Sequence, residues 1–371
     1  MNRPVRTGQL ASVSGCAPEH LGRAERAAVA ALDRLGLRAR GGLEPLATPP
    51  SRWRRQVLRV RVGAPRLGAG QVVVRVLLDP TQEELVGFAR EQHTVWVLHE
   101  AARAMEDAGR IAWTPVQPAI HQQPILLPGA AVAVYGHVPA WPGPVDAARF
   151  GAMLATLHEV TSSARAAAVM RSWPRVGLFA GLRAEDVAAA FTRAGHPLAG
   201  RADVAGAFVA AVRERALRAL ALDPRPVLAH RDLHVLNCVN TEDGPVSVDW
   251  QEAGWGSRSD DFAWLYLQVR RFGGDPVLVE QALEGYRRAA SSHQCPSLEQ
   301  VRAAAAVREL VFLGFSVANA DLDEEHRLEA LRELPALTDP QAPGQPWRLL
   351  FNPAVFDPGF LPAPSTLAVA S

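Results

Sequence analysis

The sequence predicts an α+β fold in which a small antiparallel sheet precedes a larger, mostly helical part. In the first 140 residues, short apolar runs rich in β-branched residues recur at 43–46, 57–62, 72–78 and 131–138, which is typical of strands. From residue 150 onward, apolar residues instead recur three and four positions apart, as in helices that bury one face. A chain of 371 residues with 48% hydrophobic residues can form two cores. We therefore expect two lobes.

Composition excludes several classes of protein. The formal net charge is only +1, so no strong field favours nucleic acid or an acidic membrane. Cys16, Cys238 and Cys295 are irregularly spaced, which argues against a disulfide framework or a zinc site. The first residues lack the apolar core of a signal peptide, and the longest apolar run, 124–135, is too short to span a bilayer. We expect a cytoplasmic monomer or homodimer without nucleic-acid or membrane partners.

The first part of the chain is expected to be a tail with a capping helix (1–38), followed by the smaller lobe (39–139). An alanine-rich helix is predicted over 18–35, ending at Gly36. The glycine-rich stretch 63–70 joins the second and third strands and is interpreted as a hairpin turn, in preference to a phosphate-binding loop. Residues 47–55 lack glycine but contain Arg52, Arg54 and Arg55, which would contact phosphates or face solvent.

The larger lobe is predicted over 140–334, and a proline-rich tail over 335–371. Its first helix has an apolar stripe from Phe150 to Leu157 and then His158, which we expect to be a hydrogen-bonded structural residue. No elements are assigned to 161–201. Further helices are predicted around 204–212, 262–269, 276–290 and 298–319.

The most informative stretch is 226–263, in which polar residues follow short strands. His230, Asp232 and Asn237 follow a strand at 227–228, and Asp249 ends a second strand at 246–248, after a turn at 240–244. Phosphoryl transfer from a nucleotide needs one carboxylate to orient an attacking hydroxyl, together with amide and carboxylate oxygens that hold Mg²⁺. The alternative is a β-hairpin whose polar loop carries capping Asp and Asn residues.

The motifs of this stretch resemble those of the aminoglycoside phosphotransferase and choline kinase-like family, which has a two-lobed protein-kinase-like fold. His230-Arg231-Asp232 with Asn237, then Val248-Asp249-Trp250 and Asp261-Phe262-Ala263, match its H-G-D-x-H-x-x-N, I-D-W-E and D-L-A, except that Arg231 replaces a glycine. The resemblance implies that Asp232 is the catalytic residue and that Asn237 and Asp249 bind Mg²⁺. It also implies that His230 and Asp261 brace the loop.

The resemblance also implies a nucleotide site, with ATP or GTP held between the lobes. The chain contains no lysine, and all 39 basic residues are arginine, so the usual phosphate-binding lysine is missing. We expect Arg75 to grip the phosphates and Glu91 to hold Arg75 in place; the alternative is that Arg75 is exposed at a sheet edge. The backbone of Gly136 and Val138 is expected to pair with adenine.

The acceptor is expected to be a small molecule, because the short path from Asp249 to Asp261 leaves no room for a peptide-docking activation segment. Acidic residues and a tryptophan are the candidates for binding a polyamine such as an aminoglycoside, or an amino alcohol: Glu252, Trp255, Asp321 and Asp323. The alternative is an exposed acidic turn and core aromatics. We expect a small-molecule kinase; a catalytically inactive kinase-like binding module is the other candidate.

Overall fold

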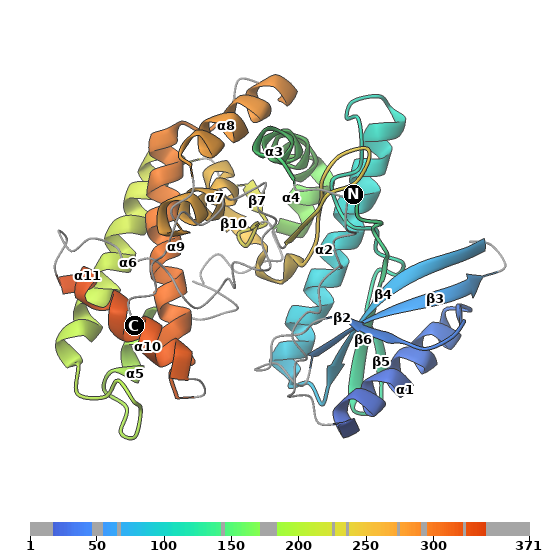
Figure 1. Cartoon of the computed structure of the whole chain (residues 1–371), viewed down its shortest axis with the longest axis horizontal. Helices are drawn as coiled ribbons and strands as arrows, with labels where there is room; N and C mark the ends of the chain where they lie inside the picture. Colours follow the sequence, from blue (N-terminus) through green and yellow to red (C-terminus); the bar gives the residue numbers. More distant parts are fainter. Residues whose placement is uncertain are drawn as a thin grey trace, which may run out of the picture. The chain divides into compact units, whose positions relative to one another are not determined.

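The computed structural model describes residues 18–46, 55–64, 68–141, 145–170, 184–224, 227–234, 237–272, 275–290, 295–321 and 324–338. Contacts divide the chain into two compact units (Figure 1). Unit 1 consists of Met1–His99 with Gln117–Val138, and unit 2 of Glu100–Val116 with Pro139–Ser371. Each unit is described by itself below.

Unit 1 contains a six-stranded antiparallel sheet with the order β1-β3-β4-β6-β5, in which β2 also pairs with β3. Its strands are β1 (Arg38–Ala39), β2 (Glu44–Leu46), β3 (Arg55–Ala64), β4 (Gly68–Leu78), β5 (Ile125–Leu127) and β6 (Ala130–Gly136). The β3 and β4 strands pair from Arg55 opposite Leu77 to Ala64 opposite Gly68. The predicted hairpin between them is therefore confirmed.

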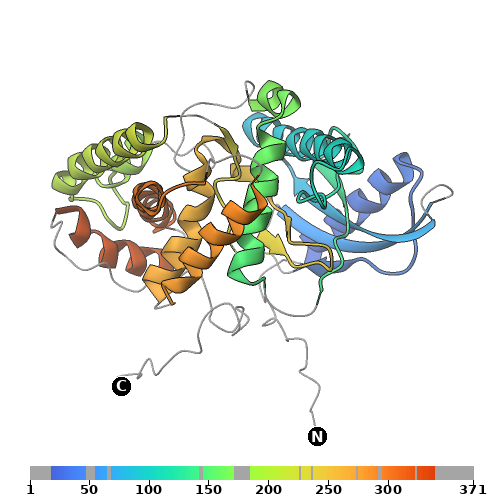
Figure 2. The same cartoon turned by 90° about the horizontal axis from the view of Figure 1, so that it is seen from above.

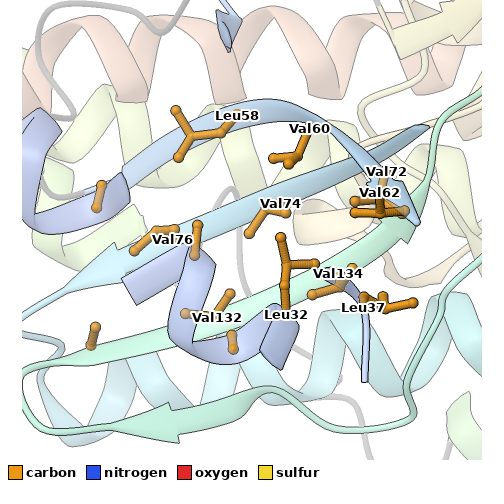
Figure 3. Packing of buried hydrophobic residues seen from close by; sticks show 14 of the residues in the cluster. Leu32, Leu37, Leu58, Val60, Val62, Val72, Val74, Val76, Val132 and Val134 are labelled. Carbon is orange, nitrogen blue, oxygen red and sulfur yellow. The ribbon is translucent and has the colours of Figure 1, made fainter. Parts of the chain in front are cut away.

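The core of unit 1 lies between one face of this sheet and helix α1 (Pro18–Arg34). Figure 3 shows Leu32 of α1 among the sheet residues Val74, Val132 and Val134, all of them fully buried. Burying each such side chain contributes about 1.5–3 kcal/mol relative to exposure. Because side chains alternate along a strand, Arg75 lies on the opposite face of β4 from the buried Val74.

Helix α2 (Gln82–Asp107) follows the sheet hairpin. Unit 2 is mostly helical, with α3 (Ala147–Thr161), α4 (Ala164–Met170), α5 (Ala184–Ala190), α6 (Ala202–Leu222), α7 (Arg258–Phe272), α8 (Val277–Ala289), α9 (Leu298–Ala318), α10 (Glu324–Glu333) and α11 (Pro335–Thr338). The helices α4 and α5 lie in the segment to which the sequence assigned no element, and α11 lies where a tail was expected.

Four short strands complete unit 2: β7 (Val227–Ala229), β8 (Cys238–Val239), β9 (Val246–Ser247) and β10 (Gly254–Gly256). The β8 and β9 strands pair across the predicted turn at 240–244, and β7 pairs antiparallel with β10. The sequence predicted neither the strand β8 nor the pairing of β7 with β10. A short 3-10 helix, η3 (Trp250–Glu252), lies between β9 and β10. No helix among the described residues has the length and apolar composition needed to cross a membrane.

Helices α3 and α8 approach each other at two glycines; Figure 2 shows α3 in green beside α8 in orange. A Cβ at Gly151 would lie 1.8 Å from the carbonyl oxygen of Ala282, and one at Gly285 would lie 2.0 Å from that of Ala148. Both distances are far below van der Waals contact, so only glycine allows this packing.

Candidate active site

The polar loop that follows β7 places Asp232 and Asn237 in direct contact. The Nδ2 amide of Asn237 donates to the backbone carbonyl of Asp232 at 2.8 Å and to its Oδ2 at 3.2 Å. Both residues are buried. The amide nitrogen of Asn237 is therefore used within the loop, and its oxygen is the atom left for a cation.

The hairpin β8–β9 brings Asp249 to the same loop. The N–H of Val248 donates to the carbonyl of Asn237 at 2.9 Å, which ties the residue before Asp249 to the predicted metal ligand. Asp249 itself has a left-handed backbone, with φ at 61°. Non-glycine residues rarely adopt this conformation, and they do so mainly where the surrounding structure holds them, often at functional sites.

His230 connects the loop to the strand that precedes Asp249. Its Nε2 donates to the carbonyl of Val248 at 2.9 Å, its Nδ1 accepts from the N–H of Asp232 at 3.4 Å, and its ring lies 4.7 Å from that of Trp250. Complete burial lowers the pKa of His230, although Asp261 opposes the shift. A neutral imidazole that donates and accepts at these two atoms fits a bracing residue, as the sequence predicted.

Asp261, in the first turn of α7, accepts hydrogen bonds from the backbone of the loop. The N–H of Arg231 donates to Oδ1 at 2.8 Å, and the N–H of His230 donates to Oδ2 at 3.3 Å. Burial alone would raise the pKa of Asp261, but the hydrogen bond and charge of His158 bring it below the ordinary value. The carboxylate is therefore ionised, and it holds the loop.

A second layer supports Asp261. Nε2 of His158, on α3, donates to Oδ2 of Asp261 at 3.1 Å, and its Nδ1 lies 3.0 Å from the hydroxyl of Tyr286 on α8. The side chains of His158 and Asp261 are at most 2% exposed. The expectation that His158 is a structural, hydrogen-bonded residue is confirmed. No sequence pattern points to Tyr286, because this residue is close to His158 only through the packing of α3 on α8.

Position 231 has a backbone that suits glycine, since φ is 67°. An arginine here carries the cost of a left-handed backbone, and its guanidinium is also taken from water. The pKa of Arg231 falls to about 10, first because of burial and then because of Arg308, while Asp260 and Glu252 oppose the fall. Glu252, predicted as a substrate residue, is 6% exposed and acts electrostatically on Arg231.

His234 lies beside the catalytic candidate, with Nε2 3.8 Å from Oδ2 of Asp232. Its ring meets that of Trp264 edge to face, with centroids 6.1 Å apart. The pKa of His234 falls to about 4, mainly through burial and then through the charge of His230. His234 is therefore neutral at physiological pH, and it adds no positive charge next to Asp232.

In unit 1, Arg75 of β4 forms an ion pair with Glu91 of α2, as predicted. Their side chains are 15% and 3% exposed, so the edge-exposed alternative is wrong. At the end of β6, the N–H of Gly136 donates to the carbonyl of Pro118 at 2.7 Å, and its carbonyl accepts from Nε2 of Gln117 at 3.1 Å. Both polar groups of Gly136 thus have partners within unit 1; its role toward adenine, like that of Val138, stays a prediction.

The remaining predicted substrate residues are placed as follows. Trp255 lies in β10 opposite Leu228 and is half-buried. Asp321 is 39% exposed and pairs with Arg193 at 3.2 Å. Asp323, Arg52 and Arg54 lie outside the described residues.

Comparisons with known proteins are consistent with the motifs. Residues 127–304 match the model of the phosphotransferase enzyme family, and no curated protein matches the chain. Among solved structures, the chain is similar to a choline/ethanolamine kinase family protein from Mesorhizobium loti, at 19% identity and a TM-score of 0.55, with 86% of this chain and 95% of that chain covered. It is also similar to the amicoumacin kinase hAmiN, at 13% identity and a TM-score of 0.53, with 90% and 96% covered.

A third similar structure is a putative fructosamine-3-kinase from Thermobifida fusca, at 19% identity and a TM-score of 0.50, with 84% of this chain and 98% of that chain covered. These likenesses confirm the predicted protein-kinase-like fold. The family match confirms the resemblance that the motifs around Asp232 and Asp249 indicated.

Proposed function

We propose that the chain, whose residues 127–304 match the model of the phosphotransferase enzyme family, transfers the γ-phosphoryl group of ATP or GTP to a hydroxyl of a small molecule. The observation that carries the proposal is the arrangement of Asp232, Asn237 and Asp249 on one hydrogen-bonded loop and hairpin. Asp261 holds the same loop by accepting a hydrogen bond from the backbone N–H of Arg231. Catalysis of phosphoryl transfer depends mainly on positioning and charge stabilisation, which a braced loop of this kind supports.

The residues present fit a Mg²⁺ ion. An amide oxygen and a carboxylate are hard oxygen donors, which Mg²⁺ prefers, with waters and phosphate oxygens completing its shell. Asn237 uses its amide nitrogen within the loop, which leaves its oxygen for the ion. We propose that Asn237 and Asp249 hold Mg²⁺, which neutralises charge on the phosphates when it is bound.

Asp232 is proposed to orient the acceptor hydroxyl and to accept its proton. Asn237 donates to Oδ2 of Asp232 at 3.2 Å and so fixes the direction of the carboxylate. The neutral His234 adds no positive charge beside this carboxylate. In unit 1, Arg75 is proposed to replace the missing lysine at the phosphates, with Glu91 holding its guanidinium.

The acceptor is proposed to be a small alcohol, such as an aminoglycoside-like antibiotic or an amino-alcohol metabolite. Support comes from a structurally similar kinase, the amicoumacin kinase hAmiN, which was solved in complex with AMP-PNP and Ca²⁺. Support also comes from the twelve-residue path between Asp249 and Asp261, which is too short for a peptide-docking segment.

The first test is a thermal melt of the full chain with Mg-ATP, with Mg-GTP and without nucleotide. A ligand at about a hundred times its dissociation constant stabilises by about 2.7 kcal/mol, enough for a shift of several degrees. We expect the wild type and the control Asp203→Asn, at an exposed carboxylate, to shift. Asp249→Asn should not shift.

Turnover distinguishes an enzyme from a binding module. Asp232→Asn should keep the Mg-ATP shift while losing a factor of about 10² to 10⁴ in ADP release with an accepted substrate. If the wild type binds Mg-ATP but never releases ADP across a panel of small alcohols, the inactive binding module takes the place of the kinase. Absence of any nucleotide shift in the wild type would contradict the nucleotide site itself.

A further inference from the structure

A buried arginine, Arg308, lies beside the candidate active site, and the proposed function gives it no role. Arg308, on α9, is 2% exposed, and its Nε has no hydrogen-bond partner. Among the residues that the structure describes, no hydrogen bond or ion pair involves this side chain. Nε of the guanidinium is therefore buried without a partner, and no carboxylate of the described chain lies within ion-pair distance.

Such a charge is costly. Burying an unpaired guanidinium costs several kcal/mol, and here a second guanidinium, that of Arg231, acts on it unfavourably. The adjacent carboxylate of Glu309 does not compensate, because it pairs with Arg271 at 3.0 Å and lies 3.7 Å from Arg215 and Arg270. A bound carboxylate would give the Nε of Arg308 the partner that it lacks among the described residues.

Helix periodicity locates Arg308 in the interface between α7 and α9. It lies one turn after Ala304 and one turn before Phe312, which share a buried cluster with Trp264 and Leu267 of α7. Residues three and four apart occupy one face of a helix. Arg308 therefore faces α7.

A second polar side chain without a partner occupies the facing surface of α7. Gln268 is 1% exposed, and neither its amide oxygen nor its amide nitrogen has a hydrogen-bond partner. Gln268 lies one turn after Trp264 and one turn before Arg271, which pairs with Glu309 of α9. It therefore lies on the face of α7 that packs on α9. Buried amides are normally satisfied, so an unsatisfied amide and an unpaired guanidinium in one interface indicate a missing ligand.

This interface adjoins the catalytic loop. Trp264 packs against Ala304 and Ala305 of α9, and its ring also meets His234, whose Nε2 is 3.8 Å from Oδ2 of Asp232. Arg231, next to Asp232 in the chain, is close enough to Arg308 for their charges to interact. A ligand held by Arg308 would therefore lie near the residue that orients the acceptor.

We propose that Arg308 and Gln268 bind a carboxylate of the phosphoryl acceptor, so that the substrate of this kinase is a small hydroxy acid. This inference rests on the proposed function and narrows its substrate class. A planar carboxylate accepts two parallel hydrogen bonds from a guanidinium, and the amide of Gln268 supplies a further donor. The bound carboxylate removes the cost of the unpaired charge, so recognition of the anion is favoured over a neutral or purely cationic alcohol.

The test uses sodium formate as the carboxylate, against sodium chloride at the same ionic strength, in thermal melts of the full chain. At about ten times its dissociation constant, formate should raise the melting temperature of the wild type by about two degrees or more. Arg308→Gln should lose this shift. Arg302→Gln, at an exposed arginine on the same helix, should keep it.

Three results would overturn the inference. Formate could leave the melting temperature of the wild type unchanged, or it could raise that of Arg308→Gln by the same amount. In the third, sodium phosphate raises the melting temperature of the wild type and sodium formate does not. If Arg308→Gln does not fold, Arg308→Lys replaces it, since lysine keeps the positive charge but lacks the two parallel N–H donors of the guanidinium. This variant should show a smaller formate shift than the wild type. An equal shift would contradict carboxylate recognition. The same variants are melted with Mg-ATP. The Mg-ATP shift should persist in Arg308→Gln, and its loss would assign Arg308 to the nucleotide instead. A wild type that responds to formate but not to Mg-ATP would leave the anion site standing and the proposed function contradicted.

Discussion

The backbone N–H of Arg231 donates to Oδ1 of Asp261 at 2.8 Å, across 30 positions in the sequence. The start of α7 thereby fixes the loop that carries Asp232. The same carboxylate contacts His158, so one buried acid connects the loop, α7 and α3.

Position 231 is predicted to be more stable with glycine than with alanine. Its φ of 67° costs a residue with a Cβ about 1–2 kcal/mol, which glycine avoids. The free energy of unfolding in urea should therefore be higher for Arg231→Gly than for Arg231→Ala by about 1 kcal/mol or more. The matched pair at Arg213, exposed in the middle of α6, should show the reverse order, because glycine costs a helix interior about 1 kcal/mol relative to alanine. Equal stability of the two variants at 231 would contradict the strained backbone.

Stability is predicted to fall as the pH drops from about 6.5 toward 4. The pKa of His234 is about 4 in the folded chain against about 6.5 when unfolded. In this window the unfolded state binds a proton that the folded state does not, so the free energy of unfolding rises with pH. The full effect is on the order of 3 kcal/mol, with a slope of up to about 1.4 kcal/mol per pH unit.

The measurement is the urea midpoint from pH 4 to 8 for the wild type and for His234→Asn. The variant should have a shallower slope, while His121→Asn, at an exposed site, serves as the control. His230, whose pKa is also lowered by burial, adds to the slope in both proteins. An unchanged slope in His234→Asn would show that His234 is not buried in its neutral form.

The glycines between α3 and α8 are predicted to be intolerant of a single methyl group. Gly151→Ala and Gly285→Ala place a Cβ within 2.0 Å of a backbone carbonyl oxygen, and overpacking of this kind costs about 1–3 kcal/mol. Gly206→Ala, in α6 with nothing within 4 Å of its Cβ, should instead stabilise by about 0.5–1 kcal/mol. Thermal melts of the three variants measure this. If all three shifted alike, the helices would not be in contact.

The pair Arg75–Glu91 is predicted to behave as a buried ion pair. Arg75→Met leaves the carboxylate of Glu91, 3% exposed, without its cation, which should cost about 3–5 kcal/mol. The double variant Arg75→Met with Glu91→Leu should recover most of this stability but not the Mg-ATP shift. A double-mutant cycle of unfolding free energies measures the coupling, and strictly additive losses would argue against the pair.

Much of the fold could be predicted from the sequence. The long strands β3 and β4 and the amphipathic helices α3, α6 and α9 have periodic patterns that few other structures satisfy. The helices α4 and α5 were missed because seven-residue helices carry only two turns of pattern. The pairing of β7 with β10 was missed because the residues Gly-Trp-Gly have no strand signature, and the partner strand lies about 25 positions earlier.

The site was predictable only as far as local motifs reach. Arg75 and Glu91 were paired because a charge interrupts an apolar strand. The same signal exists at Arg308, an arginine within an alanine-rich apolar stripe, and sequence reasoning passed over it. The contact of Tyr286 with His158 depends on the glycines of α3 and α8, and the left-handed backbone at Asp249 depends on the hairpin before it. Neither is encoded within a few neighbouring residues.

The ion pair between Arg75 of β4 and Glu91 of α2 also determines which chemical probes can report on this protein. Reagents that acylate amines label many nucleotide-binding enzymes at the lysine that contacts phosphate, but this chain contains no lysine. The guanidinium of Arg75 is a poor nucleophile. Amine-directed affinity labels would therefore pass over this site, whereas dicarbonyl reagents that condense with guanidinium groups could modify it.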